Sequence, residues 1–396
     1  MSGRESGADP SFLCVHPHCE LYGSDRTFLQ SVRALKVRWP RAKITVLLTG
    51  KGPLYEAMRE IVEDVRIDDM FVLRRSHFGP KLIFQLPRLA SRIWKARRTM
   101  ARYDVTYLNT VVVLDYMLAS RLRRRPVLIH VHELPTGITA VVFSALLWLA
   151  RAILIYISAA TRNSYGWLKR KPAVIVWNGT QARAVLPRES APGIVNLLLI
   201  GRFNAWKGQP LLLDALALLE PAERERLRVR LVGSVYAGQE HFKVAIEEKI
   251  AALDLSKTVE LLGFDPNPDR YYAWADVVAV PSMEPEPFGL VAIEAMSASR
   301  AVIAADHGGL TEIVDDGVTG TLVTPGDATA LRDAVRRYLA DPALASTQGA
   351  AGLARFAAHF AEERYMAGIA DAAQMVLDGA LPSDLAAAPV SATSVA

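Results

Sequence analysis

Short apolar and β-branched runs alternate with helical patterns along almost the whole chain, and this alternation occurs twice. The runs are typical of buried strands, and the segments between them have the spacing of helices. The predicted strands cover residues 12–15, 44–48, 105–108, 127–131 and 153–157, then 195–200, 228–232, 259–261, 277–280, 301–305 and 321–323. Strands that alternate with helices form parallel sheets through right-handed crossovers. The pattern therefore predicts an α/β protein with two doubly wound domains.

The length of 396 residues suits two domains, since domains of about 100–200 residues are typical. The Asn178-Gly179 turn signal and a polar segment with Pro187 and Pro192 indicate the boundary. We predict a first domain over 1–180, a second over 181–358, a final helix over 359–380, and a disordered Ala/Ser/Pro-rich tail over 381–396. Facing domains of this kind bind ligands in a cleft at the carboxyl ends of their strands.

The net charge of +5 is the sum of two unlike halves. Residues 1–180 contain 28 Lys and Arg against 13 Asp and Glu, whereas residues 181–396 contain 18 against 28. The first half therefore has a net charge of +15 and the second of −10. This asymmetry suggests an electrostatic partner for the first half alone.

Three features bear on localisation and metal binding. The polar N-terminus lacks the apolar core of a secretory signal, and Arg151 interrupts the apolar stretch 140–157, which we interpret as a buried helix followed by a buried strand. Cys14 and Cys19 flank two histidines, but no second cysteine pair completes a metal site. We therefore expect a cytoplasmic, soluble protein with reduced thiols and no metal.

The segment after the strand 277–280 is the most informative one. It crosses a Pro-rich turn into a helix and contains Glu286 in the turn and Glu294 in the helix. Carboxylates suit sugar hydroxyls because they accept charge-assisted hydrogen bonds. Phe288, Gly289 and Leu290 would offer backbone amides at the helix N-terminus. A helix-terminal charge and a solvated Glu would give the same pattern.

Three shorter segments also follow predicted strands. Arg202 and Lys207 come after the strand 195–200, where cations are well placed to neutralise a diphosphate. Gly23 precedes the first helix and permits close backbone approach there. His130 and His132 share one strand face and would form a metal pair, but no third ligand is evident, so His132 is better interpreted as a ligand-contacting group.

The ordered motifs GSDR, HVHE, WNG, GRFNAWKG, VRLVGS, LLGF, PEPFGLVAIEAM and DHGGLTEIVDDGVTGTLV resemble those of the family 4 retaining glycosyltransferases. The resemblance runs from about residue 12 to 377. It implies the GT-B fold, with two facing Rossmann-like domains, an N-terminal acceptor domain, a C-terminal donor domain, and a last helix that crosses back to the first domain.

The resemblance also implies a metal-independent enzyme that uses a UDP- or GDP-sugar as substrate and needs no cofactor. Arg202 and Lys207 would hold the diphosphate, Glu294 the ribose, and Glu286 the donor sugar with help from the amides of residues 288–290. His132 would contact the sugar, the Gly23 loop would close onto the donor, and Phe264 would lie near the base. The implied product is a bacterial surface polysaccharide such as O-antigen, capsule or exopolysaccharide.

The basic residues of the first half concentrate between residues 70 and 103, which contain nine Lys or Arg and no Asp or Glu. Aromatic and apolar residues are interleaved, as in helices that lie on anionic membranes. The predicted membrane or acceptor patch consists of Arg88, Arg92, Trp94, Lys95 and Arg98. A solvated helix face is the competing interpretation. A nucleic-acid partner is not expected, because no recognised binding module accompanies the charge.

Two other functions fit parts of the sequence. A GT-B nucleotide-sugar epimerase or isomerase would share the diphosphate site and lack an acceptor. A basic membrane-surface binding module with a vestigial donor site would use only the first half. The leading hypothesis is a retaining hexosyltransferase that acts on a glycan or lipid-linked acceptor, in the cytoplasm or peripherally on the inner face of the membrane.

Overall fold

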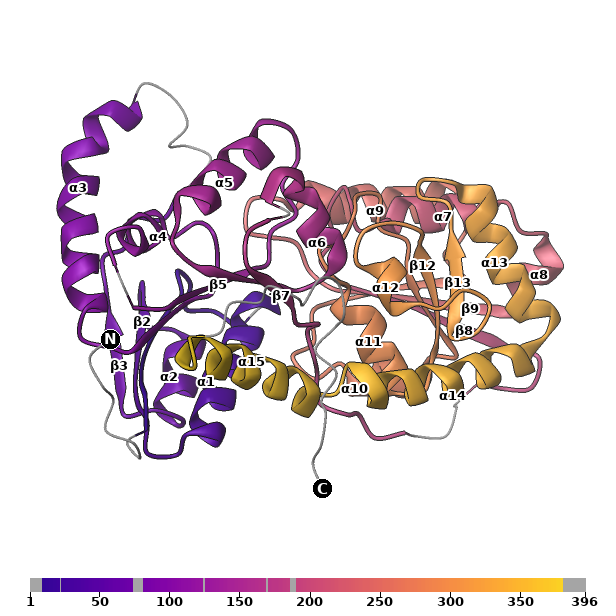
Figure 1. Ribbon diagram of the computed structural model, residues 1–396. Helices are drawn as coiled ribbons and strands as arrows, with labels where there is room; N and C mark the ends of the chain where they lie inside the picture. Colours follow the sequence, from indigo (N-terminus) through magenta and orange to yellow (C-terminus); the bar gives the residue numbers. More distant parts are fainter. Residues whose placement is uncertain are drawn as a thin grey trace. The chain divides into compact units, whose positions relative to one another are not determined.

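The computed structural model divides the chain into two compact units, each built on one parallel sheet (Figure 1). It describes residues 9–21, 23–73, 81–123, 125–168, 170–185 and 190–379, with the side chains of 81–86 left aside. The first unit comprises Met1–Asn178 with Glu362–Ala396, and the second comprises Gly179–Ala361. The predicted tail 381–396 lies outside the described residues, as do Arg74 and Arg75 of the basic segment 70–103.

The sheet of the first unit has the order β3-β2-β1-β4-β5-β6-β7, and all neighbours pair in parallel. Its strands are β1 (Ser11–Val15), β2 (Lys43–Leu48), β3 (Asp64–Ile67), β4 (Val105–Leu108), β5 (Val127–Val131), β6 (Ile153–Tyr156) and β7 (Ala173–Ile175). The five strands predicted for this half are present. The two edge strands, β3 and β7, were not predicted from the sequence.

Helices cover both faces of this sheet (Figure 1). They are α1 (Gly23–Arg38), α2 (Pro53–Arg59), α3 (Lys81–Met100), α4 (Leu114–Ser120), α5 (Gly137–Leu149), α6 (Ala159–Ser164), the 3-10 helix η2 (Gly166–Leu168) and α15 (Glu362–Leu377). One core lies beneath α1 and α15, and a second lies beneath α3, α4 and α5. Burial on both faces explains why the strands are continuous apolar runs.

The last helix, α15, packs on α1 within the first unit. The Tyr365 hydroxyl donates to the Thr27 carbonyl oxygen at 3.0 Å and shares a hydrogen bond with the Ser31 hydroxyl at 2.6 Å. These bonds are buried, so they satisfy the phenol where water does not reach it.

The second unit repeats the arrangement with the order β10-β9-β8-β11-β12-β13. Its strands are β8 (Val195–Ile200), β9 (Leu227–Val232), β10 (Val259–Leu262), β11 (Val277–Val280), β12 (Ala301–Ala305) and β13 (Gly320–Val323). Its helices are α7 (Gln209–Ala217), α8 (Pro221–Glu225), α9 (His241–Ala252), α10 (Asp269–Trp274), α11 (Leu290–Ser297), α12 (Leu310–Ile313), α13 (Ala328–Ala340) and α14 (Pro342–His359). All six strands predicted for this half are present.

Strand order reverses once in each sheet. β1 pairs with β2 on one side and β4 on the other, and β8 likewise pairs with β9 and β11. Connections leave such a point in opposite directions, which opens a crevice beyond the carboxyl ends of the two central strands. In each unit, a ligand site is therefore expected at the sheet edge formed by the carboxyl ends of the two central strands.

The structure corrects one expectation about the apolar stretch 140–157. Strand β6 is buried as predicted, but in helix α5 only Ser144 and Leu147 are buried. The outer face of α5 is exposed because, among the described residues, no helix packs over it on that side (Figure 1).

A close approach of two loops in the second unit depends on Gly208. Its φ is +81°, and a Cβ there would lie 2.0 Å from the Pro281 carbonyl oxygen. We expect Gly208→Ala to lower the free energy of unfolding by roughly 2–4 kcal/mol, because both the left-handed conformation and the clash oppose a side chain. Urea unfolding would measure this loss.

Gly238→Ala is the matched control. Gly238 has a φ of +82° with nothing within 4 Å of its would-be Cβ, so about 1 kcal/mol is expected from the backbone conformation alone. Equal losses in the two variants would contradict the close-approach explanation.

Candidate active site

An ion pair joins two loops of the second unit at the carboxyl ends of β8 and β11. Lys207 follows β8 and Glu286 follows β11, and Lys207 Nζ lies 2.8 Å from Glu286 Oε1. The side chains are 18% and 7% exposed, respectively. The Lys207 backbone N–H donates to Asn204 Oδ1 at 2.9 Å, which fixes the loop. The structure thus brings two predicted site residues together at the point where strand order reverses.

The Glu286 carboxylate is held through one of its two oxygens. Ser282 Oγ donates to the same Oε1 at 2.5 Å, and the Glu286 carbonyl oxygen accepts the Gly309 N–H at 2.8 Å. At Gly308, with a φ of +62°, a Cβ would lie 2.5 Å from that carbonyl oxygen. Within the described part of the chain Glu286 Oε2 accepts no hydrogen bond, so it can accept one from a ligand hydroxyl.

Glu294 lies on α11 and is held by two residues that the sequence analysis did not identify. The Tyr272 hydroxyl donates to Glu294 Oε2 at 2.6 Å, and Arg183 Nη2 lies 3.4 Å from Glu294 Oε1. The Arg183 guanidinium also stacks 4.6 Å from the centroid of the Tyr272 ring. Arg183 precedes the first strand of its unit in a polar connecting segment, where no spacing relates it to Glu294.

The predicted amide donors lie where α11 begins. Gly289 has a φ of +127° and immediately precedes Leu290, the first residue of α11. Phe288 is buried and packs edge-on against Phe360, with ring centroids 6.0 Å apart. The first N–H groups of a helix have no partner within it, and its positive dipole end favours anions. The segment 288–290 is therefore a turn into α11 whose amides lie at the helix N-terminus, where the helix itself supplies no acceptor.

Arg202 packs against an aromatic ring, whereas Phe264 is exposed. The Arg202 guanidinium lies over the Tyr236 ring, 3.2 Å from its centroid. Phe264 follows β10 and is 64% exposed, so packing does not explain an aromatic residue there. An exposed ring at this edge of the sheet has a face available for stacking.

In the first unit, four polar side chains form one hydrogen-bonded chain at the carboxyl ends of β1, β4 and β5. Asp25 Oδ1 lies 2.8 Å from His16 Nε2, and His16 Nδ1 lies 3.1 Å from Asn109 Nδ2. Asn109 Oδ1 in turn lies 3.1 Å from His132 Nε2. Of these four residues, the sequence analysis proposed only His132 as a site residue.

The chemistry of the groups gives this chain a direction. The Asp25 carboxylate oxygen accepts from His16 Nε2, so His16 in turn accepts at Nδ1. The Asn109 amide donates to His16 and uses its oxygen to accept from His132 Nε2. His132 is thereby held as the Nε2–H tautomer, with Nδ1 as a hydrogen-bond acceptor.

Burial keeps these imidazoles neutral. It lowers the pKa of His132 to about 3, and the neighbouring His16 lowers it further than Asp25 raises it. Burial also lowers the pKa of His16 and of His130. His132 therefore presents a neutral acceptor at pH 7.

Gly23 is the first residue of α1, the helix that carries Asp25 in its first turn. The carbonyl oxygen of Ser24 accepts from Asn109 Nδ2 at 3.2 Å. The start of α1 is thereby tied to the end of β4, next to the hydrogen-bonded chain.

The histidines that the sequence suggested as metal ligands are mostly engaged in hydrogen bonds. His16, His18 and Asp25 could offer ligand atoms within 4.8 Å of one another, but His16 and Asp25 already bond to each other. Cys14 is buried in β1, where burial raises the pKa of its thiol. His130 Nδ1 is 2.6 Å from the Tyr107 hydroxyl. The expectation of no metal stays a prediction.

The predicted patch on α3 carries less free charge than its sequence suggested. Arg88 and Arg92 pair with Asp69, and Lys95 pairs with Asp68. Arg98 lies over the Trp94 ring, 5.1 Å from its centroid, and Arg97 lies at 4.9 Å. Asp68 and Asp69 immediately precede the acid-free segment 70–103, so a charge count over that segment alone omits their negative charges.

Comparison with known proteins identifies the family. The family described as "Glycosyl transferases group 1" matches residues 191–355. The lipopolysaccharide core biosynthesis mannosyltransferase LpcC of Rhizobium leguminosarum bv. viciae is 30% identical over 288 residues, which are 70% of this chain and 76% of that protein. The chain belongs to the group 1 glycosyltransferases. A lipopolysaccharide 1,2-N-acetylglucosaminetransferase of Salmonella typhimurium is 36% identical over 37% of this chain and 39% of its own.

Solved structures place this glycosyltransferase in the GT-B fold class. Anabaena Alr3699/HepE in complex with UDP and glucose has a TM-score of 0.75 and 24% identity over 92% of this chain and 99% of its own. A glycosyltransferase of Rickettsia africae has a TM-score of 0.74 and 19% identity over 94% and 100%. Family membership decides for a glycosyltransferase, and against both the epimerase and the non-enzymatic module.

The neutral state of His132 predicts how the stability of this glycosyltransferase depends on pH. Below the unfolded pKa of about 6.5, the unfolded chain binds a proton that the folded chain takes up only near pH 3. Stability therefore falls as pH falls through this window. His132→Gln is expected to remove about 1.5 kcal/mol of the loss in the free energy of unfolding between pH 6.5 and 5.

Urea unfolding of the full chain at both pH values, followed through the transition of the first unit, would measure this difference. His18→Gln, which removes an exposed imidazole from the same unit, is the control variant. An unchanged pH dependence in His132→Gln would show that His132 takes up a proton in the folded state.

Proposed function

We propose that this glycosyltransferase is a retaining hexosyltransferase of family 4 that uses a nucleotide-diphosphate sugar without a metal ion. Its acceptor is a glycan or lipid-linked glycan of a bacterial surface polysaccharide. Relatives named as lipopolysaccharide mannosyl- and N-acetylglucosaminyltransferases support the acceptor class. Neighbouring structures that contain UDP and UDP-glucose support the donor class, for which we propose a UDP- or GDP-sugar.

The Lys207–Glu286 ion pair is the observation that carries the proposal. It places a cation and a carboxylate with one uncommitted oxygen at the preferred edge of the second unit. Lys207 and Arg202 neutralise the donor diphosphate, and Glu286 Oε2 accepts from a sugar hydroxyl. The amides of Phe288, Gly289 and Leu290 supply further donors to the sugar or phosphate.

Glu294 binds the ribose of the donor. Tyr272 and Arg183 hold its carboxylate in one orientation before any ligand arrives. Ribose hydroxyls can donate to the remaining lone pairs, since a carboxylate accepts about four hydrogen bonds. The exposed ring of Phe264 stacks on the base.

The reaction exchanges one bond at the anomeric carbon. The bond to the diphosphate breaks, and the acceptor hydroxyl oxygen bonds to the same face of the sugar. The departing phosphate oxygen takes the acceptor proton, which leaves a nucleoside diphosphate and the glycoside. Arg202 and Lys207 stabilise the charge that develops on the diphosphate. They supply the positive charge that a metal ion would otherwise provide.

The first unit provides the acceptor side of the reaction. His132 accepts a hydrogen bond from the donor sugar at Nδ1, and its tautomer is fixed by Asn109. The Gly23 segment closes toward the phosphates. We further propose a cytoplasmic location with peripheral attachment to the inner face of the cell membrane. In the ranges that the structure describes, no helix has both the length and the apolar character to cross a bilayer.

The donor assignment predicts distinct effects for the two ends of the donor site. Lys207→Ala and Glu286→Gln are expected to lower kcat roughly 100- to 1,000-fold, as the loss of a transition-state contact does. Glu294→Ala is expected chiefly to raise the KM for the donor. Steady-state kinetics would follow a thermal-shift panel of UDP-, GDP- and ADP-sugars that identifies the donor.

Glu284→Gln is the matched control, because Glu284 lies in the same loop as Glu286 and is exposed. Its kinetics should equal those of the wild type. Wild-type kinetics in Lys207→Ala, Glu286→Gln and Glu294→Ala would exclude this assignment of the site.

The proposed stereochemistry and metal independence predict two further results. The anomeric configuration of the product, measured by NMR, should match that of the donor. Turnover should be unchanged after treatment with a chelator. An inverted product would overturn the same-face mechanism, and loss of activity that Mg²⁺ restores would overturn metal independence.

A further inference from the structure

Helix α5 has an unusual composition for a helix at the surface of its unit. None of its 13 residues is charged, and only Thr139 and Ser144 carry polar side chains. A surface helix normally directs charged and polar residues to water. Ser144 lies on the buried face of α5, whereas the outer face is apolar.

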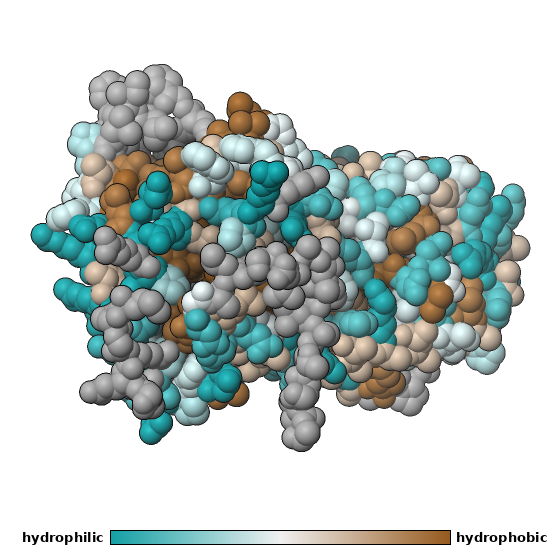
Figure 2. All heavy atoms as spheres, in the orientation of Figure 1, coloured by the Kyte–Doolittle hydropathy of each residue, from teal (hydrophilic) through white to brown (hydrophobic). Residues whose placement is uncertain are grey.

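The exposed residues of α5 form one stripe along the helix. Ile138 is 76% exposed, Val141 56%, Trp148 63% and Leu149 41%. With 3.6 residues per turn, these four positions fall within an arc of about 100° on one side of the helix. Apolar atoms also gather on the visible surface over α5 (Figure 2). Such a stripe is typical of a face that is covered in use.

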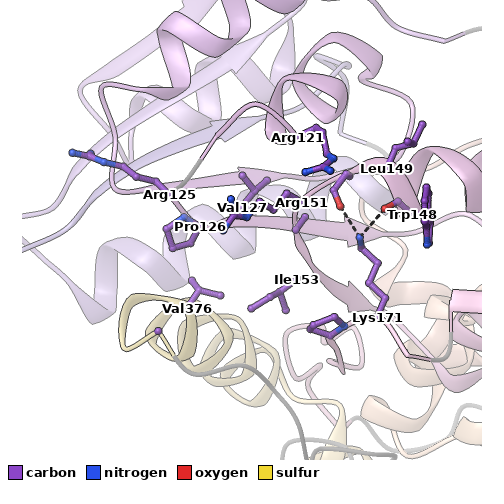
Figure 3. A pocket seen from close by; sticks show the side chains of 14 residues that line it. Arg121, Arg125, Pro126, Val127, Trp148, Leu149, Arg151, Ile153, Lys171 and Val376 are labelled. Carbon is purple, nitrogen blue, oxygen red and sulfur yellow. Dashed lines mark hydrogen bonds between the residues drawn. The ribbon is translucent and has the colours of Figure 1, made fainter. Parts of the chain in front are cut away.

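A basic pocket of about 630 Å³ adjoins the carboxyl end of this stripe (Figure 3). Arg121, Arg151 and Lys171 contribute cations to its lining, and Trp148 and Leu149 contribute apolar surface. Lys171 Nζ donates to the carbonyl oxygens of Trp148 at 3.4 Å and Ala150 at 2.5 Å, which ties the pocket to the end of α5.

Most of the positive charge that lines this pocket has no carboxylate partner in the described part of the chain. Among the residues described, no carboxylate pairs with Arg121, Arg151 or Lys171, whereas Arg125 points away and bonds to Asp104 (Figure 3). Burial lowers the pKa of Lys171, and the nearby positive charge of Arg121 lowers it further. An anion in the pocket would relieve this repulsion.

Two exposed apolar residues extend the surface beyond α5. Trp167 on η2, which packs against α5, is 57% exposed, and Leu122 beside Arg121 is 56% exposed. Tryptophan favours the boundary between headgroups and acyl chains, because its ring is apolar and its N–H is polar. Apolar, aromatic and basic groups thus lie together.

Helix α5 runs between this surface and the edge of the sheet where the strands have their carboxyl ends and where His132 lies. The helix begins five residues after His132, at the carboxyl ends of the strands. It ends at the pocket, which is lined by Val127 and Ile153, the first residues of β5 and β6. A planar partner lying along α5 would therefore extend to the edge that contains His132.

We infer that the outer face of α5 and its basic pocket form the surface on which this glycosyltransferase sits on an anionic membrane. Ile138, Val141 and Trp148 enter the boundary region of the bilayer, while Arg121 and its neighbours bind phospholipid phosphates. The earlier candidate, α3, serves less well because Asp68 and Asp69 pair with three of its cations. The inference rests on the peripheral membrane attachment proposed above, and it does not depend on the identity of the donor.

The test compares binding of the full chain to phosphatidylglycerol and phosphatidylcholine vesicles by co-sedimentation. The wild type should bind the anionic vesicles preferentially. The double variant Ile138→Ser/Trp148→Ser should bind the anionic vesicles at least roughly tenfold more weakly, because it loses two apolar side chains. Arg121→Gln should weaken binding about fivefold, as expected for one basic residue near the surface.

Trp94→Ser is the matched control, because Trp94 is a comparably exposed tryptophan on α3. It should retain wild-type binding. The Tm of each variant, with and without UDP, shows that the chain is folded and reports the donor site of the second unit separately. Failure of the donor proposal and failure of the membrane proposal thus give different results.

Several outcomes would overturn the inference. They are equal binding of the wild type to both vesicle types, unchanged binding of the double variant, and loss of binding in Trp94→Ser alone. A dimer in sedimentation velocity that the double variant abolishes, without vesicle binding, would assign α5 to a second copy of the chain. If only a variant that ends at Gly379 binds anionic vesicles, the outer face of α5 would be assigned as the binding site of residues 380–396.

Discussion

A strand in a parallel sheet is buried on both faces, and this requirement organises both units. Helices must cover each face, so every connection crosses the sheet and all carboxyl ends lie on one edge. At β1 and β4, and again at β8 and β11, the connections leave in opposite directions. Three residues of the candidate site, namely Asn109, Lys207 and Glu286, lie in the segments that follow β4, β8 and β11. The site is thus a consequence of the topology.

Polar groups at these edges are fixed before any ligand binds. In the second unit Glu286 is held by Lys207 and Ser282, and in the first unit His132 is held by Asn109. Within the ranges that the structure describes, each arrangement leaves one acceptor atom without a hydrogen bond, namely Glu286 Oε2 or His132 Nδ1. A preorganised group needs no rearrangement when charge develops in the transition state, and such preorganisation accounts for much of enzymatic rate enhancement. Each unit therefore holds a polar side chain in place before a ligand binds, and the two units use different residues to do so.

The sequence predicted most of the fold because burial produces long apolar runs with clear turn signals between them. It missed β3 because the segment Asp64–Ile67 alternates charged and apolar residues at a sheet edge, and it missed β7 because three residues give no period. Motifs located Lys207 and Glu286, but their contact spans 79 residues and follows only from the sheet order. Arg183 has no local signal at all.

The α5 and α3 helices show why surface chemistry was harder to predict than the core. Composition predicted that α5 is buried, since apolar residues usually are, but the topology provides a neighbour for only one of its faces. On α3 the count of cations was correct, yet their net effect depends on Asp68 and Asp69 from the segment after β3.

The excess of 15 positive charges in the first half of the chain is therefore unevenly available. Where carboxylates pair with cations, as Asp68 and Asp69 do on α3, the field outside the protein is reduced because opposite charges a few ångströms apart largely cancel. Where cations bond instead to carbonyl oxygens, as Lys171 does, no carboxylate of the described residues cancels their charge. Charge that stays uncancelled beside an apolar helix face selects for a partner that is both anionic and apolar. A phospholipid surface has both properties, which is why the distribution of the charge says more about the partner than its total.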